Sequence, residues 1–288
     1  MGPAIRALRP AVAVSRENPI YLAVALVTLA VSGLGSLLAR HVPVVGELLN
    51  SVLVTPALAA LMIGMAAAGL ASDAASIGDG VESLRSSYRS LVGAYVVLFG
   101  AVVLVIVAWL LEVGLVVALG GGIDLGALFT ASSRTSLGAA TDSAALGVEP
   151  APMSPATAGL VLLFTLLALA IALVGGIVVQ FFDVAIVVDG ASALSSFGDS
   201  WRLFRESPVS VLGYSVLRMV PVATAGGVVA GAYVLGGSVA GSLGAALLAL
   251  LVAAVVGPVT FAFITAYHVA YYDVRLGRPV RRRRDPVG

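Results

Sequence analysis

The chain has 288 residues, of which 60% are hydrophobic and only 11% are charged. A soluble globular domain carries roughly 25% charged residues, so a chain this poor in charge cannot cover a water-facing surface, and much of its outside must face lipid. Cysteine is absent, which excludes disulfides and thiolate metal sites. The sequence contains no catalytic, metal-binding or cofactor-binding signature, so we expect a protein that is not an enzyme and needs no cofactor.

Six stretches are long and apolar enough to cross the hydrocarbon core of a bilayer as helices, which takes about 20 residues each. The sequence therefore predicts an all-α fold, a polytopic bundle of six transmembrane helices. The last two stretches are separated only by Gly236, Gly237 and Ser238, and their combined length favours a tight hairpin over a single helix. The predicted spans are residues 19–39, 49–71, 91–119, 157–188, 208–235 and 239–272.

Arginine placement predicts the orientation. All sixteen basic residues are Arg, and six spans place thirteen of them on one side, which the positive-inside rule assigns to the cytoplasm. The other side holds Arg40 and Arg134. We therefore expect a plasma-membrane protein with both ends in the cytoplasm. A cleaved signal peptide over residues 1–35 is the competing interpretation, but its apolar run is long for such a peptide, and its loss would break the repeat described next.

Shifting the chain by 120 residues aligns two cytoplasmic segments without a gap. Residues 76–81 (SIGDGV) match residues 196–201 (SFGDSW), and a third, shorter copy aligns residues 16–19 (RENP) with residues 205–208 (RESP). Each copy precedes an outward-going span, so the pattern predicts a threefold repeat of an interfacial helix plus a transmembrane hairpin. Because all three units enter from the cytoplasm, they are parallel copies about an axis along the membrane normal. The units cover about residues 5–71, 76–188 and 194–272.

The cytoplasmic segment of the third unit has the pattern of an amphipathic helix. Phe197, Trp201 and Phe204 recur at helical spacing, with charged residues on a more polar side. Such a helix can lie in the headgroup plane with its aromatic face in the acyl boundary, so we expect these three residues to contact lipid. An ordinary polar loop is the alternative. Pro19 and Pro208 suit the first turn of the next helix, where a missing N–H costs nothing.

Three short motifs resemble those of a known group of proteins. They are residues 196–201, residues 205–208 and the sequence YYDVR at residues 271–275. They resemble uncharacterised six-span membrane proteins common in haloarchaea and, more distantly, are similar to the membrane domain fused to some bacterial glycerophosphodiester phosphodiesterases. Use of Arg without Lys is also typical of a GC-rich genome, such as that of a haloarchaeon or an actinobacterium. The sequence supplies none of the His and acidic metal ligands of a phosphodiesterase, so the resemblance implies a membrane module of unknown role and gives no ground for assigning hydrolase activity.

A charge inside the fifth span is the clearest candidate for a functional site. Counting from Pro208 at 1.5 Å per residue places Arg218 roughly 15 Å into the membrane, where a charge is costly and indicates a buried pair or a functional site. Asp183 is the candidate partner of Arg218, and Gln180 could add a hydrogen bond. Two alternatives stay open: Arg218 reaches back to the headgroups, or the cluster binds a substrate or an ion.

Aromatic and basic residues gather at the cytoplasmic end of the sixth span. We interpret the aromatic side chains and one histidine as a belt at the headgroup level: Tyr267, His268, Tyr271 and Tyr272. The tail, residues 273–288, contains a run of four arginines, Arg281, Arg282, Arg283 and Arg284. Attraction to anionic headgroups, about 1 kcal/mol per basic residue, predicts contact with lipid. The run is short and juxtamembrane, which argues against nucleic acid.

These features predict a non-catalytic membrane module that organises lipid or partner proteins through its interfacial helices and basic tail. The alternative is a transporter or channel with a polar centre near Arg218. A membrane enzyme acting on lipids would need two acids or a His–acid pair at one depth, which the spacing does not provide. Residues 120–156 are expected to form an external loop. The sequence leaves a protein partner and the oligomeric state open.

Overall fold

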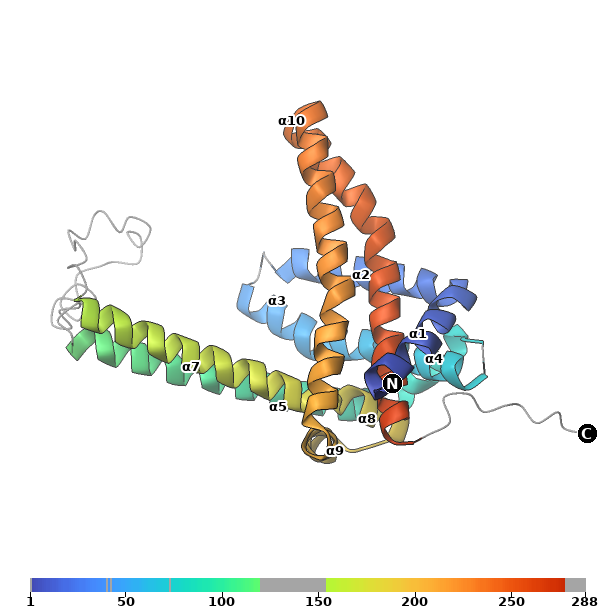
Figure 1. Ribbon diagram of the computed structural model, residues 1–288, viewed down its shortest axis with the longest axis horizontal. Helices are drawn as coiled ribbons and strands as arrows, with labels where there is room; N and C mark the ends of the chain where they lie inside the picture. The colour runs from blue at the N-terminus through green and yellow to red at the C-terminus, as the bar shows by residue number, and fades with distance from the viewer. Residues whose placement is uncertain (1, 40, 42, 73, 120–153, 278–288) are drawn as a thin grey trace, which may run out of the picture. The chain divides into compact units, whose positions relative to one another are not determined.

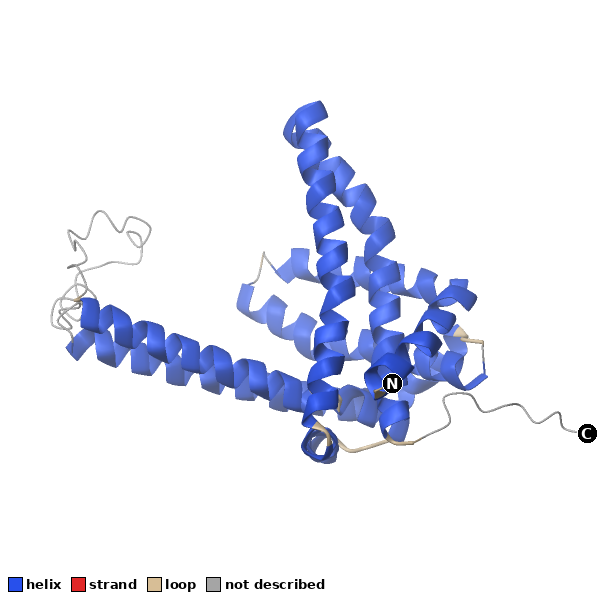
Figure 2. Cartoon of the chain, in the orientation of Figure 1, coloured by secondary structure: helices blue, strands red, loops and turns tan. Residues whose placement is uncertain are grey.

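A computed structural model describes residues 2–39, 41, 43–72, 74–119 and 154–277. Every regular element in these ranges is a helix, which confirms the predicted all-α class (Figure 2). In chain order the elements are α1 (Pro3–Glu17), α2 (Pro19–Ala39), α3 (Pro43–Leu49), the π-helix η1 (Asn50–Val54), α4 (Thr55–Ser72), α5 (Ile77–Leu119), α7 (Pro155–Val179), α8 (Phe182–Asp189), α9 (Ala193–Glu206) and α10 (Pro208–Arg275).

Five helical segments are long and apolar enough to cross a membrane. Their lengths run from 20 to 68 residues, and a crossing takes about 20. This agrees with the prediction of a membrane protein made of apolar helices. The segments are Pro19–Leu38, Val45–Ser72, Ile77–Ala118, Pro155–Asp189 and Pro208–Arg275.

The longest of these segments, α10, consists of two helical arms that turn back on each other. The backbone is non-helical at Ala240 and Gly241, and Gly241 has a φ of +69°, which glycine adopts without steric cost. A Cβ at Gly236 would lie 2.5 Å from the carbonyl oxygen of Gly244, so the arms touch next to the turn. The chain therefore reverses as predicted (Figure 1), although the turn follows the expected Gly236–Ser238 separator by a few residues.

The chain divides into two compact units, one of residues Met1–Leu98 and Ile177–Gly288, the other of residues Phe99–Gly176. In the second unit the C-terminal part of α5 and most of α7 lie side by side (Figure 1). There, the indole N–H of Trp109 donates to the Thr165 hydroxyl at 3.2 Å. Large apolar side chains on both helices are exposed, as expected where lipid rather than water is the solvent.

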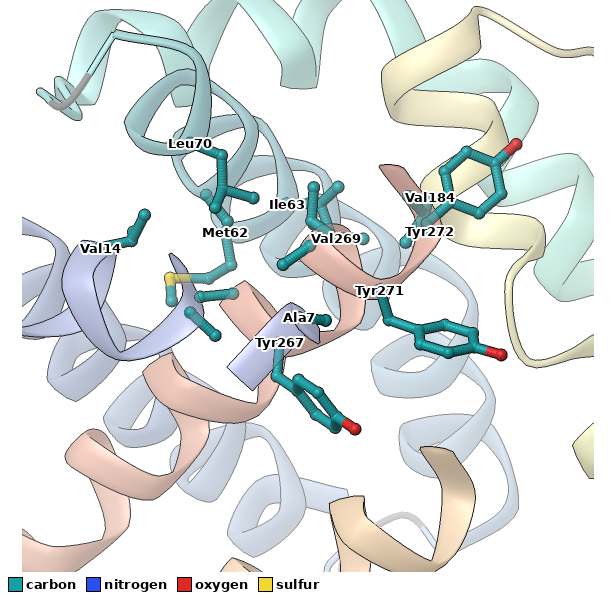
Figure 3. Packing of buried hydrophobic residues seen from close by; sticks show 14 of the residues in the cluster. Ala7, Val14, Met62, Ile63, Leu70, Val184, Tyr267, Val269, Tyr271 and Tyr272 are labelled. Atoms are coloured by element: carbon teal, nitrogen blue, oxygen red, sulfur yellow. The ribbon is translucent and has the colours of Figure 1, made fainter. Parts of the chain in front are cut away.

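The core of the first unit lies where α1, α4, α8 and the C-terminal arm of α10 meet (Figure 3). Small side chains allow α1 to approach α10 closely: Ala7 and Ala11 are fully buried. The Tyr267 hydroxyl donates to the carbonyl of Ala4 at 3.2 Å. Met62 of α4 fills the space beside α1. The aromatic C-terminal part of α10 thus holds α1 on the bundle.

Two helix junctions occur where the sequence places a proline. α2 begins at Pro19 and α10 at Pro208, as predicted. A proline disfavours helical backbone at the preceding residue, and Asn18 and Ser207 are indeed non-helical. The second copy of the motif has Tyr88 at this position, and α5 continues through it without a break. The separate interfacial helix expected before residue 91 is therefore fused with the following span.

Candidate functional site

A break in the fourth apolar segment forms one wall of the polar site. α7 ends at Val179 and α8 begins at Phe182, so the predicted span 157–188 is interrupted. The buried hydroxyl of Ser200 in α9 donates to the carbonyl of Val178 at 2.6 Å and accepts from the Phe181 N–H at 3.2 Å. Ser200 thereby satisfies backbone groups that the break frees, which is the condition for a broken helix in an apolar environment.

A chain of hydrogen bonds joins α8 to both arms of α10. Nε2 of His268 lies 3.1 Å from a carboxylate oxygen of Asp183, and Nδ1 of His268 is hydrogen-bonded to the Tyr214 hydroxyl. The His268 side chain is only 5% exposed. Phe181, at the helix break, stacks on the imidazole with ring centres 4.9 Å apart. His268 therefore has both ring nitrogens and one ring face occupied by protein.

The aromatic belt predicted at the end of the sixth span is wrong. Tyr267, His268, Tyr271 and Tyr272 are all buried in protein. A belt residue faces the lipid headgroups, whereas these side chains pack between α1, α8 and the N-terminal arm of α10. The sequence did carry a signal for this outcome: His268 and Asp183 are each isolated polar residues in apolar helices, and such residues find a partner.

The three residues predicted to form an intramembrane polar cluster lie around Tyr214. Arg218, one helical turn after Tyr214, interacts with the Tyr214 side chain. The Ser215 hydroxyl lies 3.2 Å from the amide oxygen of Gln180. The buried amide nitrogen of Gln180 forms no hydrogen bond with any residue that the structure describes. In the described part of the chain Arg218 and Asp183 form no ion pair, because the Asp183 carboxylate pairs with His268 instead. Sequence reasoning missed His268 and Tyr214, which connect the cluster.

The geometry limits the chemistry of this cluster. The expectation that no His–acid pair forms is wrong, because His268 pairs with Asp183. Together with Tyr214 they follow the order of a hydroxyl, a base and an orienting carboxylate. However, Tyr214 is 0% exposed, so its hydroxyl is closed off from solvent in this structure. Among the described residues, no three His, Cys, Asp or Glu side chains are close enough to hold a metal ion. The network links α8 to both arms of α10.

A cavity of about 200 Å³ lies among α2, α4, α5 and the C-terminal arm of α10. Hydroxyl groups interrupt its apolar wall, and the buried hydroxyl of Thr28 has no hydrogen-bond partner in the described part of the chain. Tyr95, which lines the cavity, is within electrostatic range of both Asp183 and Arg218. The volume is large enough for several water molecules at about 30 Å³ each. The hydroxyl residues of the lining are Thr28, Ser32, Thr55 and Thr265.

The segment predicted as an amphipathic helix or a loop is helical, and we refer to Leu194 and Trp201 as its apolar patch. These two side chains are 71% and 50% exposed. The other two aromatic residues divide between faces: Phe197 stacks on Phe182 at 5.2 Å, and Phe204 is half-buried beneath Trp201 at 5.9 Å. Lipid contact by the three aromatic residues stays a prediction. The four predicted tail contacts, Arg281 to Arg284, lie outside the described residues.

Comparison with known proteins gives a family but no activity. No curated protein and no solved structure matches the chain. The resemblance to haloarchaeal membrane proteins and to phosphodiesterase membrane domains stays a prediction. The model of one family, described as "Domain of unknown function (DUF7847)", matches residues 3–274. That range covers nearly the whole chain, and the protein therefore belongs to this family.

Proposed function

We propose that the protein is a non-catalytic module of the plasma membrane that organises anionic lipid or partner proteins at the cytoplasmic surface. One observation carries this proposal. The serine face of α9 is fixed on α8 by Ser200, whereas the apolar patch of α9 stays exposed beside the exposed Arg202 and Arg205. Apolar side chains flanked by arginine are what an anionic membrane surface binds.

Six membrane crossings, with both ends in the cytoplasm, are part of this proposal. The two arms of α10 each have more than the about 20 residues that a crossing needs. Together with the four other long apolar segments they supply six crossings. An even number keeps both ends on one side, in agreement with the thirteen arginines that six crossings place there.

Equivalent contacts support the proposed repeat. A Cβ at Gly80 would lie 2.9 Å from the carbonyl oxygen of Leu61, so α5 packs on α4 at this pair. Adding 120 to both numbers gives Ser200 and Phe181, the pair joined by a hydrogen bond between α9 and the α7–α8 break. The same two positions are therefore in contact in both repeats, as the proposed repeat requires.

The junctions between consecutive units support parallel copies around a common axis. Asn18, at the α1–α2 junction, accepts a hydrogen bond from the N–H of Ala75 at 2.8 Å, just before α5. In the next unit, a Cβ at Gly93 would lie 3.3 Å from that of Ala193, the first residue of α9. Each of the first two repeats therefore touches the start of the repeat that follows it.

The position of α9 supports an interfacial location. Figure 1 shows α9 nearly end-on at the base of α10, which it crosses steeply. If the arms of α10 cross the bilayer, α9 runs along the membrane surface and its apolar patch reaches the acyl boundary. Trp201 suits this position because its indole has an apolar body and a polar N–H.

A fluorescence experiment tests the lipid contact. The chain has two tryptophans, so Trp109→Phe leaves Trp201 as the only one. In phosphatidylglycerol vesicles we expect Trp201 to be quenched by lipids brominated near the headgroup. Leu194→Ser should lower the amount of spin-labelled phosphatidylglycerol that the protein immobilises, whereas Ser195→Ala, at an exposed neighbour, should not. Quenching of Trp201 by aqueous iodide alone would contradict the proposal.

A second candidate function, transport or conduction, is favoured by the cavity and the unpartnered Thr28 hydroxyl. A hydrated path would have to lead from the membrane surface into this cavity. The chain lacks cysteine, so Ser32→Cys introduces a single thiol into the cavity wall. Reaction with a membrane-impermeant thiol reagent in sealed vesicles would support the path. Protection of this thiol, while Ser195→Cys on α9 reacts in detergent, would argue against it.

A further inference from the structure

The junction between the third and the first repeat is closed where α1 packs on the C-terminal arm of α10 but open beside the N-terminal arm. The open part is an apolar groove of about 790 Å³ between the start of α1 and the start of α10, which we call the closing groove. The other two junctions are closed by the Asn18–Ala75 hydrogen bond and by the close approach of Gly93 to Ala193. The lining residues are Gly2, Pro3, Ala4, Ile5, Ser207, Pro208, Val209, Ser210, Gly213, Val216 and Leu217.

The dimensions of the closing groove fit one lipid chain. From Ser207 to Leu217 the α10 wall rises about 15 Å at 1.5 Å per residue. This length is about half of the roughly 30 Å hydrocarbon core, which is the depth of one leaflet. Gly213 lies midway along the wall, and a Cβ added there would have no neighbour within 4 Å. The groove is therefore open along the length that an acyl chain in this leaflet would occupy.

A cation lies at the end of the groove where the headgroup would be. Nη2 of Arg275 donates to the Ser207 hydroxyl at 2.6 Å, and the buried Nε of Arg275 has no hydrogen-bond partner among the described residues. In the described part of the chain Arg275 forms no ion pair with a carboxylate, and no acidic residue lines the groove. The guanidinium matches the geometry of phosphate oxygens, so Arg275 can donate hydrogen bonds to an anionic phosphate ligand at this end of the groove.

We propose that the closing groove binds one anionic phospholipid, with an acyl chain along α10 and the phosphate accepting a hydrogen bond from Arg275. The proposal rests on the proposed function for the placement of α10 across the membrane, and it names the lipid class and the site. A second copy of the chain is the competing occupant. The acyl chain fits better, because the groove is one leaflet deep and ends at a cation that forms no ion pair with a described residue.

Native mass spectrometry of the detergent-purified protein tests this site. The measured quantity is the fraction of protein that retains one phosphatidylglycerol, compared with one phosphatidylcholine, at equal added lipid. Gly213→Leu places a side chain in the groove, where its Cβ has no neighbour within 4 Å, and Gly227→Leu is the matched control, with equally open space at its Cβ on the same arm. Arg275→Gln removes the cation, and Arg85→Gln, which removes an exposed arginine of α5, is its control.

We expect the wild type and both controls to retain phosphatidylglycerol in preference to phosphatidylcholine. Gly213→Leu should retain neither lipid. Arg275→Gln should reduce the preference about fivefold, the change that corresponds to one basic residue near an anionic headgroup. Retention by Gly213→Leu equal to that of the wild type would overturn the proposal. So would an unchanged preference in Arg275→Gln, or a wild-type dimer that Gly213→Leu converts to monomer.

The two proposals fail in different ways. Retention that depends on Gly213 and Arg275, together with a Trp201 that lipid does not quench, would reject the proposed function of α9 and keep the groove site. Quenching of Trp201 by lipid without any retained phospholipid would do the reverse.

Discussion

Residues 76–91 and residues 196–211 carry the same motif 120 positions apart, yet their backbones differ. The first segment continues into a single 43-residue helix, α5, whereas the second ends at Glu206 and a new helix starts at Pro208. At the aligned position α5 has Tyr88. Proline disfavours helical backbone at the residue before it. This single difference in sequence explains why the chain bends before Pro208 but continues as one helix through Tyr88.

The same two regions also contact their preceding helices differently. Gly80 of α5 packs directly on the backbone of Leu61 in the unbroken α4. Ser200 of α9 instead forms hydrogen bonds with backbone groups at the break between α7 and α8. An intact helix has no free backbone groups in its middle, so close approach there requires a small residue. A broken helix frees N–H and C=O groups, so its partner must hydrogen-bond.

The largest effect is expected from copying the proline into the first region. Tyr88→Pro removes a helical hydrogen bond in the interior of α5 and places the ring against the carbonyl of Leu84, at a cost of about 3 kcal/mol or more. It also removes the hydrogen bond from the Tyr88 hydroxyl to the Leu53 carbonyl. The free energy of unfolding from an SDS titration in detergent micelles measures the change. Tyr88→Phe, which loses only the hydrogen bond, is the control.

A slightly smaller effect is expected where α5 touches α4. In Gly80→Val the Cβ would lie 2.9 Å from the Leu61 carbonyl oxygen, and backbone atoms cannot move away cheaply. We expect a destabilisation of about 2–3 kcal/mol from overpacking. Gly198→Val is the control, because Gly198 in α9 has open space around its Cβ position. Equal loss of stability in both variants would show that helix propensity, rather than the α4–α5 contact, sets the effect.

Sequence alone predicted the features of this comparison that depend on local chemistry. Long apolar runs gave the helices, and Pro19 and Pro208 marked two helix starts. The break at Gln180 and Phe181 was not predictable, because no proline or glycine lies at these positions. It depends on Ser200 of a later helix, whose hydroxyl stabilises the freed backbone groups.

The candidate site shows the same limit. Arg218, Asp183 and Gln180 were identifiable as polar residues in apolar helices, but their actual partners were not. His268 and Asp183 are 85 positions apart, and neither spacing nor periodicity reports which helices become neighbours. The tyrosines around His268 have the composition of a membrane belt, and only the packing of α1 and α8 on α10 distinguishes a buried cluster from a belt.

Removing the hydroxyl that stabilises the break should have a moderate effect. Ser200→Ala leaves the Phe181 N–H and the Val178 carbonyl without their buried partner. Leaving buried polar groups unsatisfied costs about 1–3 kcal/mol, and we expect about 2 kcal/mol in the same SDS titration. Ser196→Ala is the control, since this equally buried serine bonds only the carbonyl of Ala193 in its own helix. A stable Ser200→Ala variant would mean that water satisfies the break.

The smallest effect is expected from Pro208→Ala, the reverse of the first substitution. Losing a proline at a compatible position costs about 0.4–1 kcal/mol of stability, because the unfolded chain gains conformational entropy. The junction should nevertheless stay bent, because Ser200 holds α9 on α8 and Ser207 accepts a hydrogen bond from Arg275. Spin labels at the exposed Leu194 and Val216, introduced as the only cysteines, report the bend.

A continuous helix would separate the two labelled backbones by about 33 Å at 1.5 Å per residue, and a bent junction keeps them closer. We expect Pro208→Ala to preserve the wild-type distance and the double variant Pro208→Ala, Ser200→Ala to approach the longer one. Straightening by Pro208→Ala alone would assign the bend to proline only. In that case the first region is straight simply because it has Tyr88, and the contacts of α9 follow from the bend instead of maintaining it.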